Sequence, residues 1–311
     1  MKTNRTYNIR RIIRKIFGRR MERCIIDYAV KPNRTHNNKL STFFFTALCM
    51  PYAFISYFQK VIPYVEMDIT SRCTLNCREC THFIPEYKQK EKAADFDAEL
   101  LIENIELLLP MITKCCSFRI LGGEPFLHKQ LYLIINKLIE ESKIKHIEIV
   151  TNGTIMPNGE NLNVLAHKKV NVSISDYGTL SNKKDEIIKV FAERNINTNV
   201  DQHIWFETNS LKQRGYSSEK MKSVFFSCSG AECKTLYDGK LWVCPQALHG
   251  FLLGLVKENP HEYIDLRKST KKEFWKKLKQ MYRSSIDLTT CYYCTGGCAE
   301  FVKQVPCAEQ E

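Results

Sequence analysis

The chain has 311 residues, of which 44% are hydrophobic and 26% are charged, as in an ordinary globular protein. A chain of this length can bury one large core or two modest ones, so it does not need a metal or disulfides to fold. Its fourteen cysteines are therefore not a secretory disulfide framework, which belongs to much smaller scaffolds.

The formal net charge of +12 is unevenly distributed along the chain. Residues 1–39 contain twelve lysines or arginines and two acidic residues, a net charge of +10, and the rest of the chain contributes the remaining +2. The basicity belongs to a separable extension, which we place at residues 1–60. Because the body is nearly neutral, we expect no nucleic-acid partner.

Within this extension, Ile9, Ile12, Ile13, Ile16 and Phe17 recur at helical spacing among basic residues. A basic amphipathic helix can lie on an anionic membrane surface or an acidic partner, or it can pack its apolar stripe against the body of the protein. Both alternatives stay open.

Two further features bear on localisation. The apolar run at 43–58 contains Pro51 and is shorter than the roughly 20 residues that span a bilayer. The basic N-terminus lacks the apolar region and cleavage site of a signal peptide. We expect a cytoplasmic protein with reduced cysteines, held peripherally at the inner face of the membrane if the helix binds lipid.

Three cysteines, Cys73, Cys77 and Cys80, follow the strand-like run 64–70 with the spacing C-x3-C-x2-C. Three thiolates on one loop are one short of a closed tetrahedral metal site. His82 can complete a zinc site, but a compact triplet is atypical of zinc. The triplet fits an iron-sulfur cluster with one exchangeable iron better.

The triplet together with Leu121-Gly-Gly-Glu-Pro125 resembles the radical S-adenosylmethionine (SAM) superfamily. The resemblance implies a 4Fe-4S cluster on the three cysteines, whose free iron binds SAM. An electron from a donor such as flavodoxin or ferredoxin then cleaves SAM to a 5′-deoxyadenosyl radical, which abstracts a substrate hydrogen. Glu79 stands where the superfamily often has an aromatic. Thr81-His-Phe83 is similar to a branch associated with sugar modification.

Strand and helix patterns alternate between residues 61 and 225, the proposed radical SAM core. The strands are expected at 64–70, 118–121, 146–150, 170–175 and 196–206, and the helices at 97–109, 130–141, 160–168 and 183–194. Such alternation predicts an α/β fold, a partial (β/α)6 TIM-like barrel with parallel strands. The motifs fall at the carboxyl ends of the strands, where ligands bind.

The resemblance also suggests which side chains contact SAM. Gly122 and Gly123 suit close approach of the ligand to the backbone, and Glu124 can accept from its ammonium group. Asn152 and Ser173 are the candidates near the ribose.

The last expected strand carries four polar or aromatic residues on one face. They are proposed to line the substrate pocket, against the alternative that they are simply packed: Asp201, His203, Trp205 and Glu207.

Residues 226–311 contain a second group of cysteines around the hairpin signal Asp238-Gly239. They resemble a twitch domain, a small α+β domain that binds an auxiliary 4Fe-4S cluster; the two-cluster version, SPASM, needs more cysteines. The implied ligands are Cys233, Cys244, Cys291 and Cys294. Cys228 and Cys298 are then candidate hydrogen donors to a substrate radical, with Cys307 also left over. We assign Cys24, Cys49, Cys115 and Cys116 as inert thiols.

Two classes of function remain. The first is a radical SAM oxidoreductase or epimerase acting on a sugar, sugar nucleotide or polysaccharide precursor, with peptide modification as the alternative substrate class. The second is a non-catalytic metal-binding module.

Overall fold

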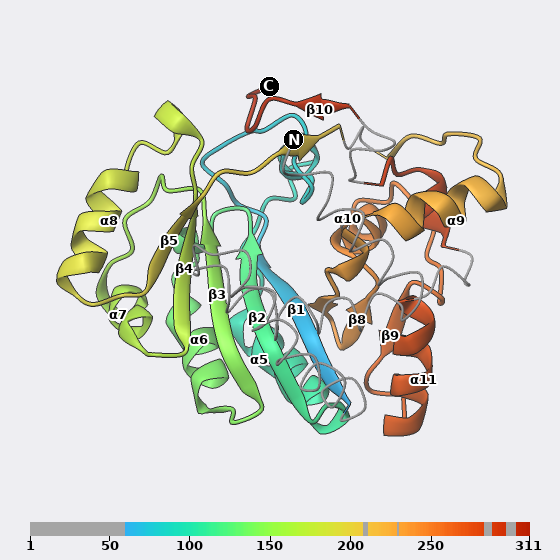
Figure 1. Cartoon of the computed structure of the whole chain (residues 1–311), viewed down its shortest axis with the longest axis horizontal. Helices are drawn as coiled ribbons and strands as arrows, with labels where there is room; N and C mark the ends of the chain where they lie inside the picture. The colour runs from blue at the N-terminus through green and yellow to red at the C-terminus, as the bar shows by residue number, and fades with distance from the viewer. Residues whose placement is uncertain (1–59, 208–210, 229, 283–287, 297–302) are drawn as a thin grey trace, which may run out of the picture.

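The computed structural model describes residues 60–311 except 208–210, 229, 283–287 and 297–302 (Figure 1). The predicted extension lies outside the described residues, as do Cys24, Cys49 and Cys298. Within the described part of the chain, no helix is long and apolar enough to cross a membrane.

Five parallel strands form the centre of the fold and confirm the predicted α/β class. Neighbours in space are neighbours in sequence, in the order β5-β4-β3-β2-β1. The strands are β1 (Val61–Thr70), β2 (Lys114–Gly122), β3 (Ile144–Thr151), β4 (Val170–Ser175) and β5 (Thr198–Asp201).

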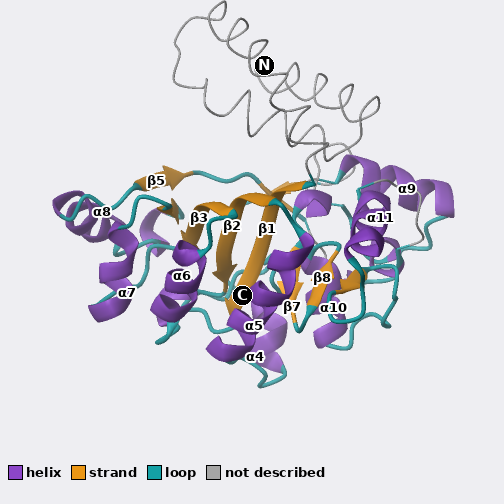
Figure 2. Ribbon diagram, turned by 90° about the horizontal axis from the view of Figure 1, so that it is seen from below, coloured by secondary structure: helices purple, strands orange, loops and turns teal. Residues whose placement is uncertain are grey.

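Helices connect these strands, and Figure 2 shows α5, α6 and α7 on the same face of the sheet. In α5, buried Leu101, Ile105 and Leu108 recur at helical spacing, and Asp97 caps the helix by accepting from the Leu100 N–H. The helices of this half are α4 (Ile84–Gln89), α5 (Ala98–Leu108), α6 (Leu131–Glu140), α7 (Gly159–Asn163) and α8 (Lys184–Glu193).

The predicted hairpin is present as β7 (Thr235–Tyr237) and β8 (Lys240–Trp242), followed by β9 (Tyr263–Asp265). Asp238 and Gly239 both have positive φ, 47° and 64°, as a two-residue turn between twisted strands requires.

This hairpin is part of the main sheet rather than of a separate one. β7 lies beside β1, with Thr235 paired in parallel to Glu66, so the sheet has eight strands in the order β5-β4-β3-β2-β1-β7-β8-β9. The expected boundary at 225/226 falls inside α9 (Ser218–Ser227), and α10 (Pro245–Leu252) and α11 (Lys271–Met281) follow. The division into two domains stays a prediction.

The prediction of one strand over 196–206 was wrong. β4 ends at Ser175, whose partner is Asp201, so the chain has no neighbouring strand beyond that point and leaves the sheet. It pairs again as β6 (Trp205–Phe206), antiparallel to β10 (Gln304–Val305). Short 3-10 helices lie at Leu109–Met111, Pro125–Leu127, Val164–Ala166, Gly178–Leu180, Gly230–Glu232 and Thr289–Tyr292.

Alanine substitutions at one buried and one exposed isoleucine test where the hydrophobic core lies. Ile149 in β3 is 0% exposed, whereas Ile188 on α8 is 36% exposed. We expect Ile149→Ala to lower the free energy of unfolding by about 2–5 kcal/mol, through lost burial and an unfilled cavity. Ile188→Ala should change it by about 0.5 kcal/mol or less. Urea denaturation measures both, and equal losses would contradict this placement of the core.

Candidate functional site

The cysteine triplet lies at the carboxyl ends of the strands, as predicted. Cys73, Cys77 and Cys80 follow the end of β1 and line a cavity of about 470 Å³. The ends of β2 and β3 reach the same cavity through Gly122 and Thr151. This is the edge of a parallel sheet at which ligands usually bind.

The Gly-Gly-Glu-Pro segment holds the cysteine loop in place. The N–H of Gly123 donates to Thr70 O and that of Glu124 to Arg72 O, each at 2.8 Å. A Cβ on Gly122 would lie 2.3 Å from Thr70 O, and one on Gly123 would lie 2.0 Å from Arg72 O. The glycines are therefore required by the close approach of two protein segments. Both also line the cavity, so the expected approach of a ligand to their backbone stays a prediction.

Glu124 has a different environment from the one expected. Its carboxylate is fully buried and accepts hydrogen bonds from the Thr151 hydroxyl and from the N–H groups of Phe126 and Asn152, at 2.8–3.0 Å. Burial raises the pKa of Glu124 to about 7. These internal donors join Glu124 to the start of the loop after β3. Glu124 is not among the residues that line the cavity, and its contact with an ammonium group stays a prediction.

Asn152 does reach the cavity. Its amide Nδ2 donates to Thr74 Oγ1 at 3.1 Å and lies 3.5 Å from Cys73 Sγ. The loop after β3 is thereby joined to the cysteine loop.

Ser173, the other candidate near the ribose, does not line the cavity. Its hydroxyl is buried and donates to Asp201 Oδ2 at 2.7 Å, outside the cavity lining. Ser175, two residues on and on the same face of β4, lines the cavity instead.

Of the four residues expected along the last strand, His203 and Trp205 line the cavity, whereas Asp201 and Glu207 do not. Because β5 ends at Asp201 and β6 begins at Trp205, His203 and Trp205 do not lie on one face of a continuous strand, contrary to our expectation. Trp205 packs edge-on against Tyr177, with ring centroids 5.7 Å apart. The pair gives the cavity an aromatic wall.

Two thiols of the triplet accept hydrogen bonds within the protein. The N–H of Leu75 donates to Cys73 Sγ at 3.4 Å, and Gln310 Nε2 donates to Cys77 Sγ at 3.2 Å. Burial raises the pKa of Cys73 to about 11 and that of Cys80 to about 12. Such thiols become thiolates when a metal supplies the compensating charge.

The spacing of the cysteines does not fit zinc. Four thiolates about 2.3 Å from one zinc ion lie roughly 3.8 Å from each other. Among the described residues, no three cysteines have all their sulfur atoms within 4.8 Å of one another. His82, the alternative fourth ligand, is held by Asp68, with Nδ1 3.1 Å from Oδ2.

Three of the four predicted ligands of the auxiliary cluster, Cys244, Cys291 and Cys294, lie close to one another and to Cys228, and the ligand set itself stays a prediction. Burial raises the pKa of Cys244, Cys291 and Cys294, and the nearby thiol of Cys228 raises the pKa of each further. Cys228, the C-cap residue of α9, therefore lies close to these three cysteines, and α9 contacts the segment that contains Cys291.

Cys233 lies instead at a polar wall of the cavity that we did not anticipate. Cys233 raises the pKa of both Tyr64 and Arg119, so its thiol is near them. Arg119 pairs with Glu148, Nε to Oε2 at 2.8 Å, and stacks on the Tyr64 ring at 4.9 Å. Glu66 accepts from the Tyr64 hydroxyl at 2.9 Å. The polar residues that alternate along β1 were the sequence signal for this wall. Their partners on β2 could not be predicted, because they depend on the register between the two strands.

Glu124 also makes folding depend on pH. Its pKa is about 7 in the folded chain and about 4.5 when unfolded. Between these values only the folded chain holds the proton, so stability falls as pH rises, by at most about 1.4 kcal/mol per pH unit. We expect Glu124→Gln to remove this part of the slope in urea denaturation at pH 5, 6 and 7. The exposed Glu160→Gln is the control, and equal slopes in all three proteins would contradict the assignment.

The chain was compared with known proteins. Residues 67–177 match the family model of the radical SAM superfamily. GTP 3′,8-cyclase of Campylobacter jejuni subsp. doylei is 29% identical over 150 residues, 46% of this chain and 42% of the relative. That of Alkaliphilus metalliredigens is 30% identical over 120 residues, 38% of this chain and 36% of the relative. The chain thus spans less than half the length of these relatives.

Similar solved structures include anSMEcpe with bound AdoMet, at 13% identity and a TM-score of 0.49, covering 76% of this chain and 86% of that one. BtrN in complex with AdoMet and 2-DOIA has 17% identity and a TM-score of 0.47, and the match covers 79% of this chain and 100% of that one. The match to the family model runs from the end of β1 through β4 and includes the cysteine loop. Residues 67–177 are therefore similar to the radical SAM superfamily, and Cys73, Cys77 and Cys80 lie within that match.

Proposed function

We propose that this chain is a radical SAM enzyme that acts on a sugar, a sugar nucleotide or a polysaccharide precursor. The observation that carries the proposal is the position of Cys73, Cys77 and Cys80, which line one cavity at the carboxyl ends of parallel strands. Three thiolates would hold three irons of a four-iron cluster and leave the fourth for another ligand.

The residues around the triplet fit this group. The cysteines are too far apart for one zinc ion, and two of them accept hydrogen bonds that stabilise the thiolate form. When bound, the cluster and SAM supply an oxidising carbon radical that removes a hydrogen atom from the substrate. The task of the protein is to position both partners and to exclude water.

Three side chains are placed to bind SAM or the substrate. Asn152 presents its amide beside the cysteine loop, and Ser175 presents a hydroxyl from β4. Trp205 offers a flat surface on which an adenine or a sugar ring can pack.

Two charged residues of the cavity lining support a polar substrate. Glu66 and Arg119 line the cavity, so it offers both a carboxylate and a guanidinium to hydroxyl and phosphate groups. Its volume of about 470 Å³ is in the range of small-molecule sites. The matched relatives are named GTP 3′,8-cyclases, and GTP also joins a sugar to phosphate groups.

The second cysteine group adds an auxiliary cluster to the proposal. Cys228, Cys244, Cys291 and Cys294 provide four thiolates, a closed set for a second four-iron cluster. Cys228 and Cys294 line the same cavity as the triplet. A cluster at this place is positioned to exchange an electron with a bound substrate.

The proposal is tested by anaerobic purification and reconstitution. We expect about eight irons per chain, and SAM cleavage to methionine and 5′-deoxyadenosine after reduction by dithionite or flavodoxin. Cys77→Ala should lose about four irons and all cleavage, because it removes a ligand of the first cluster. Cys115→Ala, at a buried cysteine of β2, is the control and should keep both. Zinc in place of iron would identify a non-catalytic metal-binding module.

The substrate class is tested with the same preparation. Sugar nucleotides and peptides are supplied in parallel, and 5′-deoxyadenosine formation is compared with that in the absence of substrate. We expect stimulation by a sugar nucleotide. Stimulation by peptides alone would replace the proposal with a peptide-modifying maturase.

The revised ligand set has its own test. Cys228→Ala should retain about four irons and lose the auxiliary cluster, whereas Cys233→Ala should retain about eight. Iron analysis and electron paramagnetic resonance of the reduced proteins measure the difference. If Cys233→Ala loses the cluster and Cys228→Ala keeps it, the set predicted from the sequence is right.

A further inference from the structure

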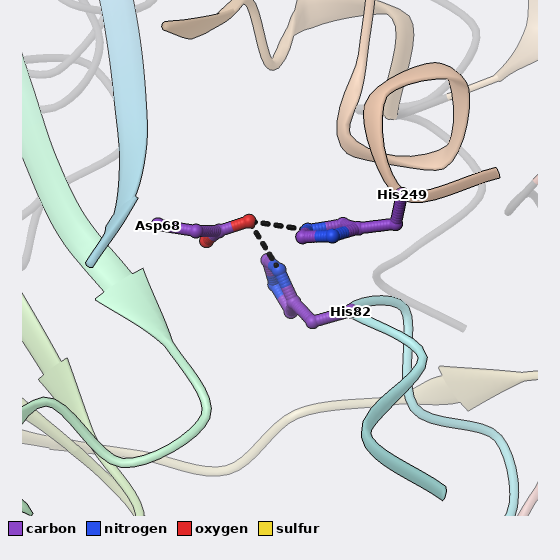
Figure 3. Close-up of side chains that lie close together, drawn as sticks. All are labelled: Asp68, His82 and His249. Carbon is purple, nitrogen blue, oxygen red and sulfur yellow. Dashed lines mark hydrogen bonds and ion pairs between the residues drawn. The ribbon is translucent and has the colours of Figure 1, made fainter. Parts of the chain in front are cut away.

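A second group of ligating side chains lies beside the cysteine loop. Asp68 comes from β1, His82 follows Cys80 by two residues, and His249 belongs to α10 (Figure 3). One ligating atom from each of the three lies within 4.8 Å of the others. In the part of the chain that the structure describes, it is the one group of three His, Cys, Asp or Glu side chains that meets this condition.

Both imidazoles point at the same carboxylate oxygen. His82 Nδ1 lies 3.1 Å and His249 Nε2 lies 2.5 Å from Asp68 Oδ2. Three donor atoms suited to a metal, one carboxylate oxygen and two imidazole nitrogens, therefore converge on one point.

The surroundings of the group resemble the outer shell of a metal site. The second nitrogen of His249, Nδ1, lies 2.9 Å from the Tyr87 hydroxyl, which fixes the orientation of the ring. Asp68 Oδ1 is buried and has no hydrogen-bond partner among the described residues. A hydrogen-bonded network alone leaves this oxygen unsatisfied, which costs about 1–3 kcal/mol.

One side of the group faces the cavity. His82 lines it together with the cysteine triplet, whereas Asp68 and His249 are 1% exposed. Catalytic metal sites commonly have three protein ligands and one position open to solvent or substrate. Two imidazoles and one carboxylate suit Zn²⁺ and Fe²⁺.

We propose that Asp68, His82 and His249 bind one Zn²⁺ or Fe²⁺ ion, whose open position faces the cavity and takes an oxygen atom of the substrate. Ligands about 2.0–2.1 Å from a tetrahedral ion lie roughly 3.3 Å from each other. The distance from His82 to Asp68 is already close to this value. The distance from His249 to Asp68 lengthens on binding. The site goes beyond the proposed function and does not depend on SAM cleavage.

The test uses the whole chain after its iron-sulfur clusters have been reconstituted, with zinc as the probe. After anaerobic dialysis against Zn²⁺, we expect one zinc per chain, measured by mass spectrometry of the metals. X-ray absorption at the zinc edge should show a first shell of nitrogen and oxygen at about 2.0–2.1 Å. Sulfur neighbours at about 2.3 Å would place the zinc on cysteines and overturn the proposal, as would a chain that retains no zinc.

Single substitutions test two of the three proposed ligands, Asp68 and His249. His249→Ala and Asp68→Asn should lower zinc affinity at least tenfold. Tyr87→Phe, which removes only the hydroxyl, should lower it roughly 10- to 100-fold. His128→Gln, at a buried histidine outside the group, is the matched control and should bind zinc like the unaltered chain. Unchanged affinity in His249→Ala would refute the site.

Two readouts keep this test separate from that of the proposed function. Iron content and SAM cleavage are measured on the same samples, so a chain without cleavage that binds zinc through nitrogen and oxygen still supports the site. If the variants do not fold, the absorption spectrum of the unaltered chain decides alone.

Discussion

The site depends on the close contact between the two loops that follow β1 and β2. Backbone hydrogen bonds from Gly123 and Glu124 to Thr70 and Arg72 leave no room for a side chain at the glycines. This contact turns the cysteine loop over the ends of the parallel strands. A loop with three thiols is otherwise free to adopt many conformations, and each would place a cluster differently. The geometry of the cysteine loop is thus set by backbone atoms of the neighbouring loop.

The parts of the fold that sequence reasoning predicted correctly are those governed by local rules. Short segments rich in apolar residues located β1 to β4, because parallel strands buried on both faces are mostly apolar, and Asp238-Gly239 located the hairpin, because few residues accept positive φ. The position of the triplet also followed, since a loop after a parallel strand lies at the ligand-binding edge.

Sequence reasoning could not predict arrangements that depend on contacts between distant segments. Ser173 and Ser175 share a strand face, and the sequence does not show that only Ser175 lines the cavity. Cys228 and Cys233 are five residues apart, and only the packing of the end of α9 shows that Cys228 lies near the C-terminal thiols. Asp68 and His249 are 181 positions apart, so no local pattern joins them.

The last residues of the chain contact the cysteine loop through the side chain of Gln310. Gln310 donates one hydrogen bond to the sulfur of Cys77 and accepts another from the N–H of Asn76. Hydrogen bonds to the sulfur ligands are among the factors that set the reduction potential of an iron-sulfur cluster. In the proposed holoenzyme, the docking of residues 308–311 would therefore be coupled to the energy of an electron arriving at the cluster on Cys77. A chain whose C-terminal residues left the loop would hold this cluster at a different potential from a chain whose C-terminal residues were bound.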